Sequence, residues 1–290
     1  MEFDGASQGN DPNRQADCAG FVSQLEETLL KLFSAKEYTP PLLPKVALEL
    51  LELSRRNEAS ARSISDLLSK DAILAARVLR IAESPVYSAG RPIRSLDEAI
   101  MRLGLRRVSD LFMRAAVEMR IFRAAGYEEP MQRLAKHSAF TAEMARKVSR
   151  ATTGFDDFAF LCGLLHDVGA AAVAIAVTDA DRTPSRPSFE QVWQCAAANH
   201  ARFGQRIAEL WQLPSDIALV IGMHHAPSDG KHIHPLAAAI ALADCLAEET
   251  EHGFQHEADP ILTGQLATQL GLSRVQLDDL RQTAQHLTSC

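Results

Sequence analysis

The chain has 290 residues, of which 47% are hydrophobic and 23% are charged, an ordinary globular composition that can bury a large core without disulfides or metals. Its 30 basic and 37 acidic residues give a formal net charge of -7, which argues against nucleic acid as a partner held by a basic surface. The 5 cysteines are far apart and form no C-x-x-C pair, which argues against a disulfide framework and a thiolate zinc site.

The first 20 residues are polar and show no hydrophobic period, so we predict a disordered leader over residues 1–20. They contain no apolar stretch of the kind found in signal peptides, and we expect a cytoplasmic protein. From Phe21 onward the spacing of apolar residues is helical and shows no strand alternation. The predicted fold class is therefore all-α.

The segment 21–128 is predicted to form an N-terminal half of short helices. Apolar residues at the spacing i, i+4, i+7 mark two of them, at Val46, Leu50 and Leu53 and at Leu74, Val78 and Ile81. Asp71 is the expected N-cap of the second helix, and Ser84-Pro85 is expected to stop it. Ser95 and Glu98 predict a capping box that opens a helix ending at Gly104, and a longer helix is expected over residues 105–126.

A cluster of arginines crowds this last region and is opposed only by Asp110 and Glu118. Its members are Arg102, Arg106, Arg107, Arg114, Arg120 and Arg123. We favour the solvated face of a long helix. The alternative is a docking surface for an acidic partner or a phosphorylated ligand.

The segment 129–258 is predicted to form a second helical bundle, and it contains nearly all of the histidines. Its longest apolar run, Phe158 to Val177, has about the length of a membrane span. Because this run contains His166, Asp167 and two glycines, we predict a buried pair of helices and no membrane partner.

The last segment, 259–290, is predicted to form a helical hairpin with a turn at Gly271-Leu272-Ser273. A helix-turn-helix DNA reader has comparable punctuation. Arg274 and Arg281 are balanced by Asp278 and Asp279, however, so a packing hairpin is the favoured interpretation.

The pair His166-Asp167 lies in the apolar stretch Leu164–Gly169. Such a pair is costly to bury unless it is paired or bound to a metal. Imidazole nitrogen and carboxylate oxygen suit zinc, manganese, iron or nickel. Further candidate metal ligands on other predicted helices are His137, His200, His224, His225 and Asp244.

Each candidate also has an ordinary interpretation, since a histidine on an apolar helix face is often a packed core residue and a lone aspartate often caps a backbone. The combination and its order, His, His-Asp, His, His-His, Asp, favour a metal site built from facing helices. A bound ion could also be purely structural, with every position closed by protein ligands. His232 and His234, which follow the histidine pair, are interpreted as surface residues.

The order His137, His166-Asp167, Asp244 resembles the HD superfamily, whose metal-dependent phosphohydrolases carry H…HD…D on a helical bundle. With His200, His224 and His225, the set resembles the HD-GYP branch, which comprises cyclic-dinucleotide phosphodiesterases with two or three metals.

The first half is similar to another branch, the HDOD (HD-related output domain) family of bacterial signalling modules. The matching segments are Leu43-Pro44, the stretch Ser65–Ala82, the turn Ala82–Tyr87 and the segment Ile93–Gly104. The resemblance covers about residues 25–255 and implies an N-terminal helical subdomain packed on an HD-like bundle.

Two departures from the active enzymes bear on catalysis. Active HD phosphodiesterases carry a lysine shortly after the His-Asp pair, and Ala170 stands at that place, so a cation that would stabilise phosphoryl charge is missing. After the histidine pair, Asp229-Gly230 is kept but the Gly-Tyr-Pro sequence is not. Most members of the HDOD family are regarded as catalytically silent.

These observations leave two hypotheses. The favoured one is a non-catalytic signalling output module that binds partner proteins such as a response regulator or a kinase, in a two-component setting, with a metal or a nucleotide as a further ligand. The alternative is a phosphohydrolase acting on a nucleotide or cyclic dinucleotide with bound Fe, Mn, Ni or Zn, in which the catalytic residue Asp167 bridges the ions and orients the attacking water.

Overall fold

The computed structural model describes residues 12–43, 45–55, 60–84, 93, 95–152, 154, 156–180, 187–254 and 258–288. Within these ranges every regular element is a helix, and the only β-pairing is an isolated bridge between Ser228 and Ile233. The prediction of an all-α fold is confirmed. The leader before residue 12 and the turn Pro85–Tyr87 lie outside the described residues.

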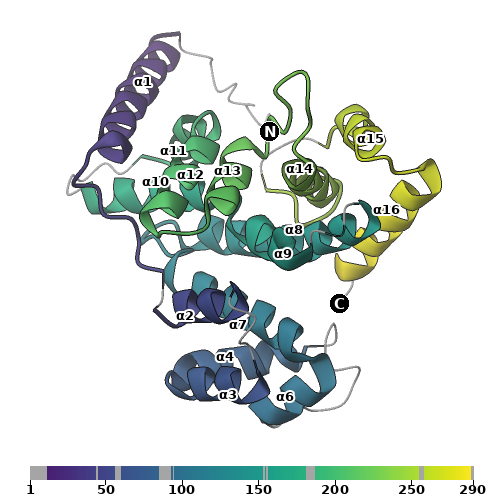
Figure 1. Ribbon diagram of the computed structural model, residues 1–290. Helices are drawn as coiled ribbons and strands as arrows, with labels where there is room; N and C mark the ends of the chain where they lie inside the picture. Colours follow the sequence, from purple (N-terminus) through teal and green to yellow (C-terminus); the bar gives the residue numbers. More distant parts are fainter. Residues whose placement is uncertain are drawn as a thin grey trace, which may run out of the picture.

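The helices form two main groups, one above the other in Figure 1. The N-terminal helix group is α2 (Lys45–Arg55), α3 (Ala61–Ser69), α4 (Ala72–Ala82), α6 (Leu96–Leu103) and α7 (Leu105–Arg120). The C-terminal bundle is α8 (Glu128–Thr152), α9 (Asp156–Leu165), α10 (Val168–Ala180), α11 (Phe189–Ala197), α12 (His200–Leu210), α13 (Ser215–Met223) and α14 (Pro235–Glu248). The remaining helices, α1 (Pro12–Ser34), α15 (Pro260–Gln269) and α16 (Arg274–Thr288), pack around the bundle.

The helix starts of the N-terminal group follow the predicted caps. Asp71 Oδ1 accepts hydrogen bonds from the backbone N–H groups of Ile73 and Leu74, and Ser95 Oγ accepts one from Glu98 N–H. Gly104 ends α6 with a φ of 81°, a conformation that glycine adopts without steric cost. These local hydrogen bonds explain why the starts of α4 and α6 were predictable.

Three expectations about helix bounds and membership were wrong. Residues 12–20, expected in a disordered leader, are the first part of α1. The helix expected over 105–126 ends at Arg120, and the two residues that follow it, Ile121 and Phe122, are 0% and 4% exposed. The helix α1, expected in the N-terminal half, packs instead on the bundle, where the Phe33 ring stacks on Phe203 of α12.

The helix α8 is the central element of the bundle, packed between α9 and α14. A Cβ atom at Gly163 of α9 would lie 2.8 Å from the Ala142 Cα of α8, so the two backbones touch. The stretch Phe158–Asp179 is apolar and long enough to cross a membrane, but 89% of its most apolar window is buried inside the protein. It comprises α9 and α10, which confirms the predicted buried helix pair.

The two groups are joined by charged side chains between α7 and α8. Glu143 accepts from Arg107 at 2.9 Å and from Arg146 at 2.7 Å, and Arg146 also donates to Asp110 at 3.0 Å. The arginine cluster is therefore not a single solvated face. Arg107 bridges to α8 and Arg114 pairs with Glu118, whereas Arg106, Arg120 and Arg123 are exposed.

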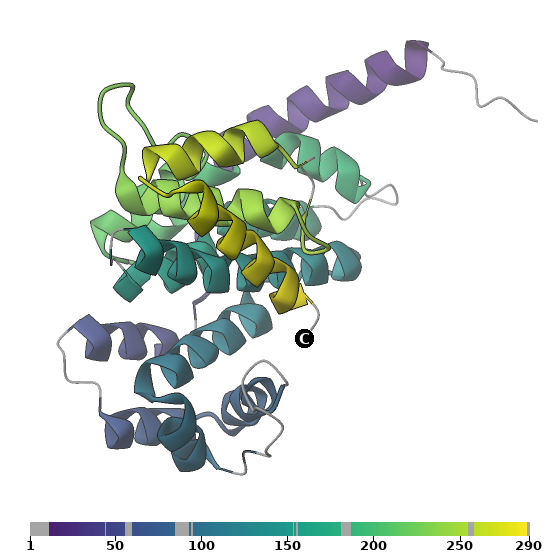
Figure 2. The ribbon, with the colours of Figure 1, turned by 90° about the vertical axis from the view of Figure 1, so that its right-hand side faces the viewer.

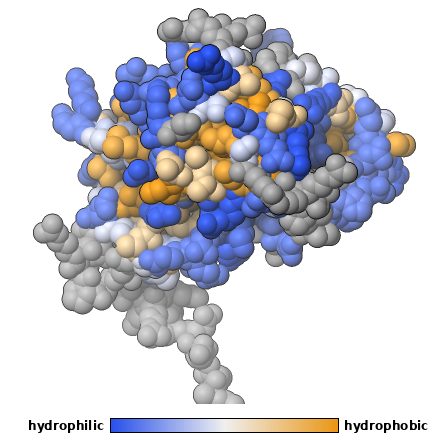
Figure 3. Space-filling model, turned by 90° about the horizontal axis from the view of Figure 1, so that it is seen from below, coloured by the Kyte–Doolittle hydropathy of each residue, from blue (hydrophilic) through white to orange (hydrophobic). Residues whose placement is uncertain are grey.

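The two C-terminal helices flank the bundle, and Figure 2 shows α16 lying across its outside. Arg281 of α16 donates to both carboxylate oxygens of Glu249, at 2.8 and 3.0 Å, which uses one of the two arginines of this segment for packing. Seen from below in Figure 3, the molecule shows apolar side chains among polar ones. In the N-terminal group, Ile73 and Met101 are 72% and 79% exposed.

Candidate metal centre

The residues predicted as metal ligands converge inside the C-terminal bundle. Their side-chain nitrogen and oxygen atoms form two groups, and within each group these atoms all lie within 4.8 Å of one another. The His137 group consists of His137, His166 and Asp244, and the His200 group consists of Asp167, His200, His224 and His225.

The His137 group is closed off from solvent. His137 comes from the middle of α8, Asp244 from α14, and His166 from the residues that follow α9. The His137 Nε2 atom lies 3.1 Å from Asp244 Oδ1 and 3.2 Å from His166 Nε2. All three side chains are buried, so only small species can reach this group.

The His200 group reaches the protein surface on one side. The His200 Nε2 atom lies 3.2 Å from Asp167 Oδ1 and 2.8 Å from His225 Nε2. The His224 Nε2 atom is 3.6 Å from the same Asp167 oxygen. His225 is exposed whereas the other three residues are buried, so this group has an accessible edge.

Asp167 is a member of the His200 group, but its second carboxylate oxygen also lies close to the His137 group. Its Oδ1 atom faces His200 and His224, and its Oδ2 atom lies 3.4 Å from His166 Nε2 and 3.8 Å from His137 Nε2. A carboxylate with one oxygen toward each of two ligand groups has the geometry of a bridge between two ions.

The chain places the His-Asp pair at a break between two helices and not within one. Helix α9 ends at Leu165 and α10 begins at Val168, so His166 and Asp167 lie in the turn between them. Glycine is required at position 169, because a Cβ atom there would collide with the His200 carbonyl oxygen and lie 2.6 Å from Gly204 N. This close approach brings the start of α12, which carries His200, against the Asp167 turn.

Four of the histidines are oriented by backbone carbonyl groups. Their Nδ1 atoms lie within hydrogen-bond distance of carbonyl oxygens, namely His137 to His252 (3.0 Å), His166 to Gly163 (2.8 Å), His200 to Ala197 (2.9 Å) and His224 to Ile221 (2.7 Å). Because a carbonyl oxygen can only accept, each Nδ1 must carry the proton. In the neutral ring, Nε2 then presents its lone pair to the cluster, as in metal-binding histidines.

Two observations show that the cluster fits a metal ion. The His224 Nε2 atom is buried and has no hydrogen-bond partner among the residues that the structure describes, which costs free energy unless something else satisfies it. The Nε2 lone pairs of His137 and His166 face each other at 3.2 Å, and they need a proton or a metal ion between them. Buried imidazole and carboxylate donors match zinc, manganese, iron or nickel.

The electrostatics of the metal-free cluster favour ionised carboxylates. Burial alone would raise the pKa of Asp244, but the hydrogen bond from His137 holds that pKa well below its usual range. Burial lowers the pKa of His137, yet the hydrogen bond and charge of Asp244 outweigh it and raise this pKa to about 9. Burial lowers the pKa of His166 to about 4, so its ring stays neutral. A metal ion in this group would therefore displace one proton from His137.

The surroundings of the cluster include residues that the sequence analysis did not identify. The Trp193 ring stacks on His200 with centroids 5.9 Å apart, and the Glu248 Oε1 atom lies 4.0 Å from His137 Nδ1. Glu248 and His252 follow Asp244 at helical spacing, by four and eight residues, and this spacing was the available signal for them.

Three other residues considered in the sequence, namely His232, His234 and Ala170, lie outside the two groups. The His232 side chain is 86% exposed, and His234 caps α14 by accepting from Ala237 N–H, so neither belongs to the two groups. Ala170, which stands where active enzymes carry lysine, is 4% exposed in the apolar core.

Comparison with known proteins places this site in a family context. A model of the HDOD domain family matches residues 41–227. Over 261 residues the chain is 24% identical to an uncharacterized protein of Treponema pallidum (strain Nichols), a match that covers 85% of the chain and 49% of the relative. The chain thus spans about half the length of that relative.

Solved structures with the same fold cover nearly the whole chain. An HDOD domain protein of unknown function from Geobacter sulfurreducens has a TM-score of 0.66 at 22% identity, covering 92% of this chain and 97% of that one. A protein proposed to be a metal-dependent phosphohydrolase, from Shewanella amazonensis SB2B, has a TM-score of 0.68 at 22% identity with the same coverage. A protein proposed to act in signal transduction, from Marinobacter aquaeolei VT8, has a TM-score of 0.65 at 21% identity, covering 94% and 65% of the two chains.

Proposed function

The chain belongs to the HDOD family, and from this premise we propose that it is a bacterial signalling module whose C-terminal bundle holds two divalent metal ions. In this proposal the His137 group and Asp167 hold one ion, and the His200 group holds the other. The ions would lock the turn after α9 to α8, α12, α13 and α14. Metal occupancy would therefore set the shape of the bundle that partner proteins meet.

One observation carries the proposal. Asp167 directs one oxygen to each ligand group, and the buried Nε2 atom of His224 beside it has no hydrogen-bond partner in the described part of the chain. A cluster of packing histidines would use up its own donors and acceptors, since buried polar atoms are rarely left unpaired. Nitrogen and oxygen donors in these numbers suit Fe, Mn, Ni or Zn.

Elemental analysis of protein purified without chelator tests this directly. We expect near-stoichiometric metal in the native protein and a loss in His166→Ala and Asp244→Ala. The control is His232→Ala, which removes an exposed histidine outside both groups and should keep its metal. A native protein that stays metal-free after soaking with all four ions would contradict the proposal.

A second candidate function, metal-dependent phosphoester hydrolysis, is favoured by the exposed edge of the His200 group. His225 is exposed, so a substrate phosphate could approach from that side, and Asp167 lies behind it. Bound metals would polarise the phosphate and make the attacking water more acidic. Asp167 would orient that water, and the buried Ala170 supplies no positive charge for the phosphoryl oxygens. We therefore expect at most slow turnover of a nucleotide or cyclic dinucleotide.

An assay of the metal-loaded protein distinguishes the two functions. Bis(p-nitrophenyl) phosphate and a cyclic dinucleotide serve as substrates, with Asp167→Asn as the inactive reference. Turnover that disappears in Asp167→Asn supports the hydrolase. Equal background in both proteins supports the non-catalytic module.

The module is proposed to act in the cytoplasm through a response regulator or a kinase of a two-component system. The support is family membership and the likeness to a protein proposed to act in signal transduction. A two-hybrid screen against the response regulators and kinases of the host organism tests it. Failure to recover any of them would contradict this partner class.

A further inference from the structure

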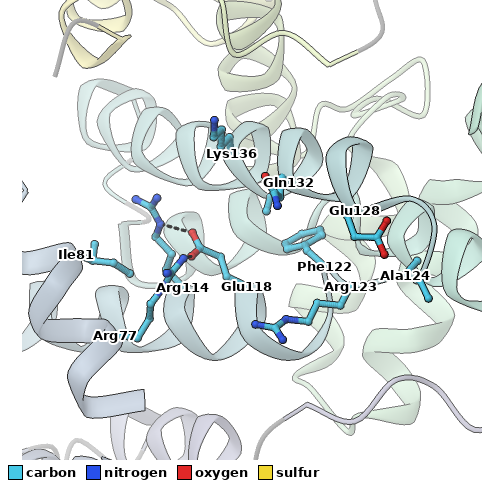
Figure 4. Close-up of a pocket in the computed structure, with 12 residues that line it drawn as sticks. Arg77, Ile81, Arg114, Glu118, Phe122, Arg123, Ala124, Glu128, Gln132 and Lys136 are labelled. Atoms are coloured by element: carbon cyan, nitrogen blue, oxygen red, sulfur yellow. Dashed lines mark hydrogen bonds and ion pairs between the residues drawn. The ribbon is translucent and has the colours of Figure 1, made fainter. Parts of the chain in front are cut away.

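A cleft separate from the metal centre lies between the N-terminal helix group and α8. Its volume is about 690 Å³, and Figure 4 shows it between α4 and α7 on one side and α8 on the other. Residues of three helices and one turn line the cleft. They include Arg77 and Ile81 of α4, Arg114 and Glu118 of α7, Phe122, Arg123 and Ala124 of the turn after α7, and Glu128 and Lys136 of α8.

The cleft is positively charged although the whole chain is acidic. Four basic and two acidic side chains line it, in a protein whose formal net charge is -7. Glu118 is neutralised by Arg77 at 3.0 Å and by Arg114 at 2.7 Å. Arg123 and Lys136 are exposed, and in Figure 4 the Arg123 side chain extends toward the part of the cleft where Arg77 and Arg114 meet.

The cleft also has an apolar floor and a continuation. Phe122 and Ala124 line it and are 4% and 5% exposed, so its floor belongs to the core. A second hollow of about 490 Å³ shares Arg77, Glu118 and Arg123 with the cleft and adds Arg80. Positive charge is therefore concentrated where the two hollows join, with apolar surface beside it.

We propose that this cleft binds a small phosphate-bearing molecule of nucleotide size. The phosphate would sit among Arg77, Arg123 and Lys136, because guanidinium groups form paired hydrogen bonds to phosphate and lysine adds a point charge. The apolar remainder would lie against Phe122. Small-molecule pockets usually have volumes of about 300–1,000 Å³, and this cleft lies within that range.

The site is distinct from the metal centre but shares a helix with it. Lys136 lines the cleft, and the next residue, His137, belongs to the His137 group. The proposed ligand would contact both α4 and α8 and so bridge the two helix groups. This gives a signalling module a second ligand whose binding does not require metal.

Isothermal titration calorimetry of the full chain with GMP, AMP, guanosine and inorganic phosphate tests the proposal. We expect at least one nucleotide to bind with a stoichiometry of one, phosphate to compete weakly, and guanosine not to bind. Loss of one charged phosphate contact should weaken nucleotide binding about tenfold or more in Arg123→Ala and in Lys136→Ala. Both side chains are exposed, so these variants should fold normally, which a thermal melt confirms.

Two controls separate this site from other sources of binding. Arg120→Ala removes an exposed arginine of α7 that lines neither hollow, and it should bind nucleotide as the native chain does. The native chain, measured with and without chelator, should bind nucleotide equally, because the proposed contacts involve none of the candidate metal ligands. The proposal is overturned if no nucleotide binds at millimolar concentration or if Arg123→Ala binds normally. It is equally overturned if chelator abolishes binding to the native chain, or if only an acidic peptide such as oligoglutamate binds.

Discussion

At the scale of single residues, Asp167 differs from the other candidate ligands because its two carboxylate oxygens face different ligand groups. Asp244 lies beside His137 and His166 alone, whereas Asp167 lies beside four histidines. The His225 Nε2 atom lies 2.8 Å from His200 Nε2, within the His200 group. The candidate ligands therefore divide into one residue that two ions would share and several that would each serve one ion.

This division predicts different metal stoichiometries for single variants. Asp167→Asn should reduce binding at both positions, whereas Asp244→Asn and His225→Ala should each leave one ion bound. Calorimetric titration of chelator-treated protein with Mn²⁺ or Zn²⁺ measures the number of sites. Equal losses in all three variants would mean that the cluster holds a single ion.

Gly169 is a second residue with a clear role, because it lets the start of α10 approach the backbone of α12 closely. We expect Gly169→Ala to destabilise the protein by about 1–3 kcal/mol, because its Cβ atom would overlap the backbone of α12. The displaced His200 should also lower the metal content. Gly264→Ala is the control, since a Cβ there meets nothing within 4 Å and alanine favours the helix. Thermal melts of both variants give the comparison, and equal melting temperatures would show that the α10–α12 contact can relax.

At the scale of elements, α8 connects the two parts of the molecule. Its residue His137 lies in the candidate metal centre, and its residues Glu143 and Arg146 lie against α7. Glu143 and Arg146 are each 5% exposed, so their charges are desolvated and depend on each other and on Arg107.

Removing one member of this network should be costly. We expect Glu143→Ala to lower the free energy of unfolding by about 3–5 kcal/mol, because two guanidinium groups lose their shared buried partner. Glu209→Ala breaks an exposed pair with Arg206 and should cost no more than about 1 kcal/mol. Urea unfolding followed by circular dichroism measures both. A similar small effect for Glu143→Ala would mean that water replaces the lost carboxylate.

At the scale of the whole molecule, α1 crosses from the N-terminal end of the chain to the C-terminal bundle. Its Phe33 ring lies 4.2 Å from that of Phe203, and its Glu26 accepts from the Asn199 side chain at 2.7 Å. Asn199 immediately precedes His200, so this helix supports the segment that carries a candidate ligand.

The packing of α1 predicts a stability effect that reaches the metal centre. Phe33→Ala should cost about 3–5 kcal/mol, the usual range for deleting a buried aromatic side chain. Leu32→Ala, one position earlier and 38% exposed, should cost much less. The melting temperature of each variant, with and without metal, is the measurement. An unchanged melting temperature in Phe33→Ala would show that α1 is detached in solution.

The helical class, several helix ends and the residue types of the cluster could be predicted from the order of the residues alone. Asp71, Ser95 and Gly104 act on their own neighbouring backbone, so their effect is visible locally. The end of α7 was missed because no glycine or proline follows Arg120 directly to mark it, the next residues being Ile121 and Phe122.

How residues far apart in the chain combine depends on the packing of the folded protein. His137 and Asp244 are 107 positions apart in the chain, and their 3.1 Å contact depends on how α8 packs against α14. The same holds for the bridging orientation of Asp167, the placement of α1 and the cleft between α4, α7 and α8. Periodicity and caps are interactions within a few residues, whereas these arrangements come from close packing between helices that the sequence order does not specify.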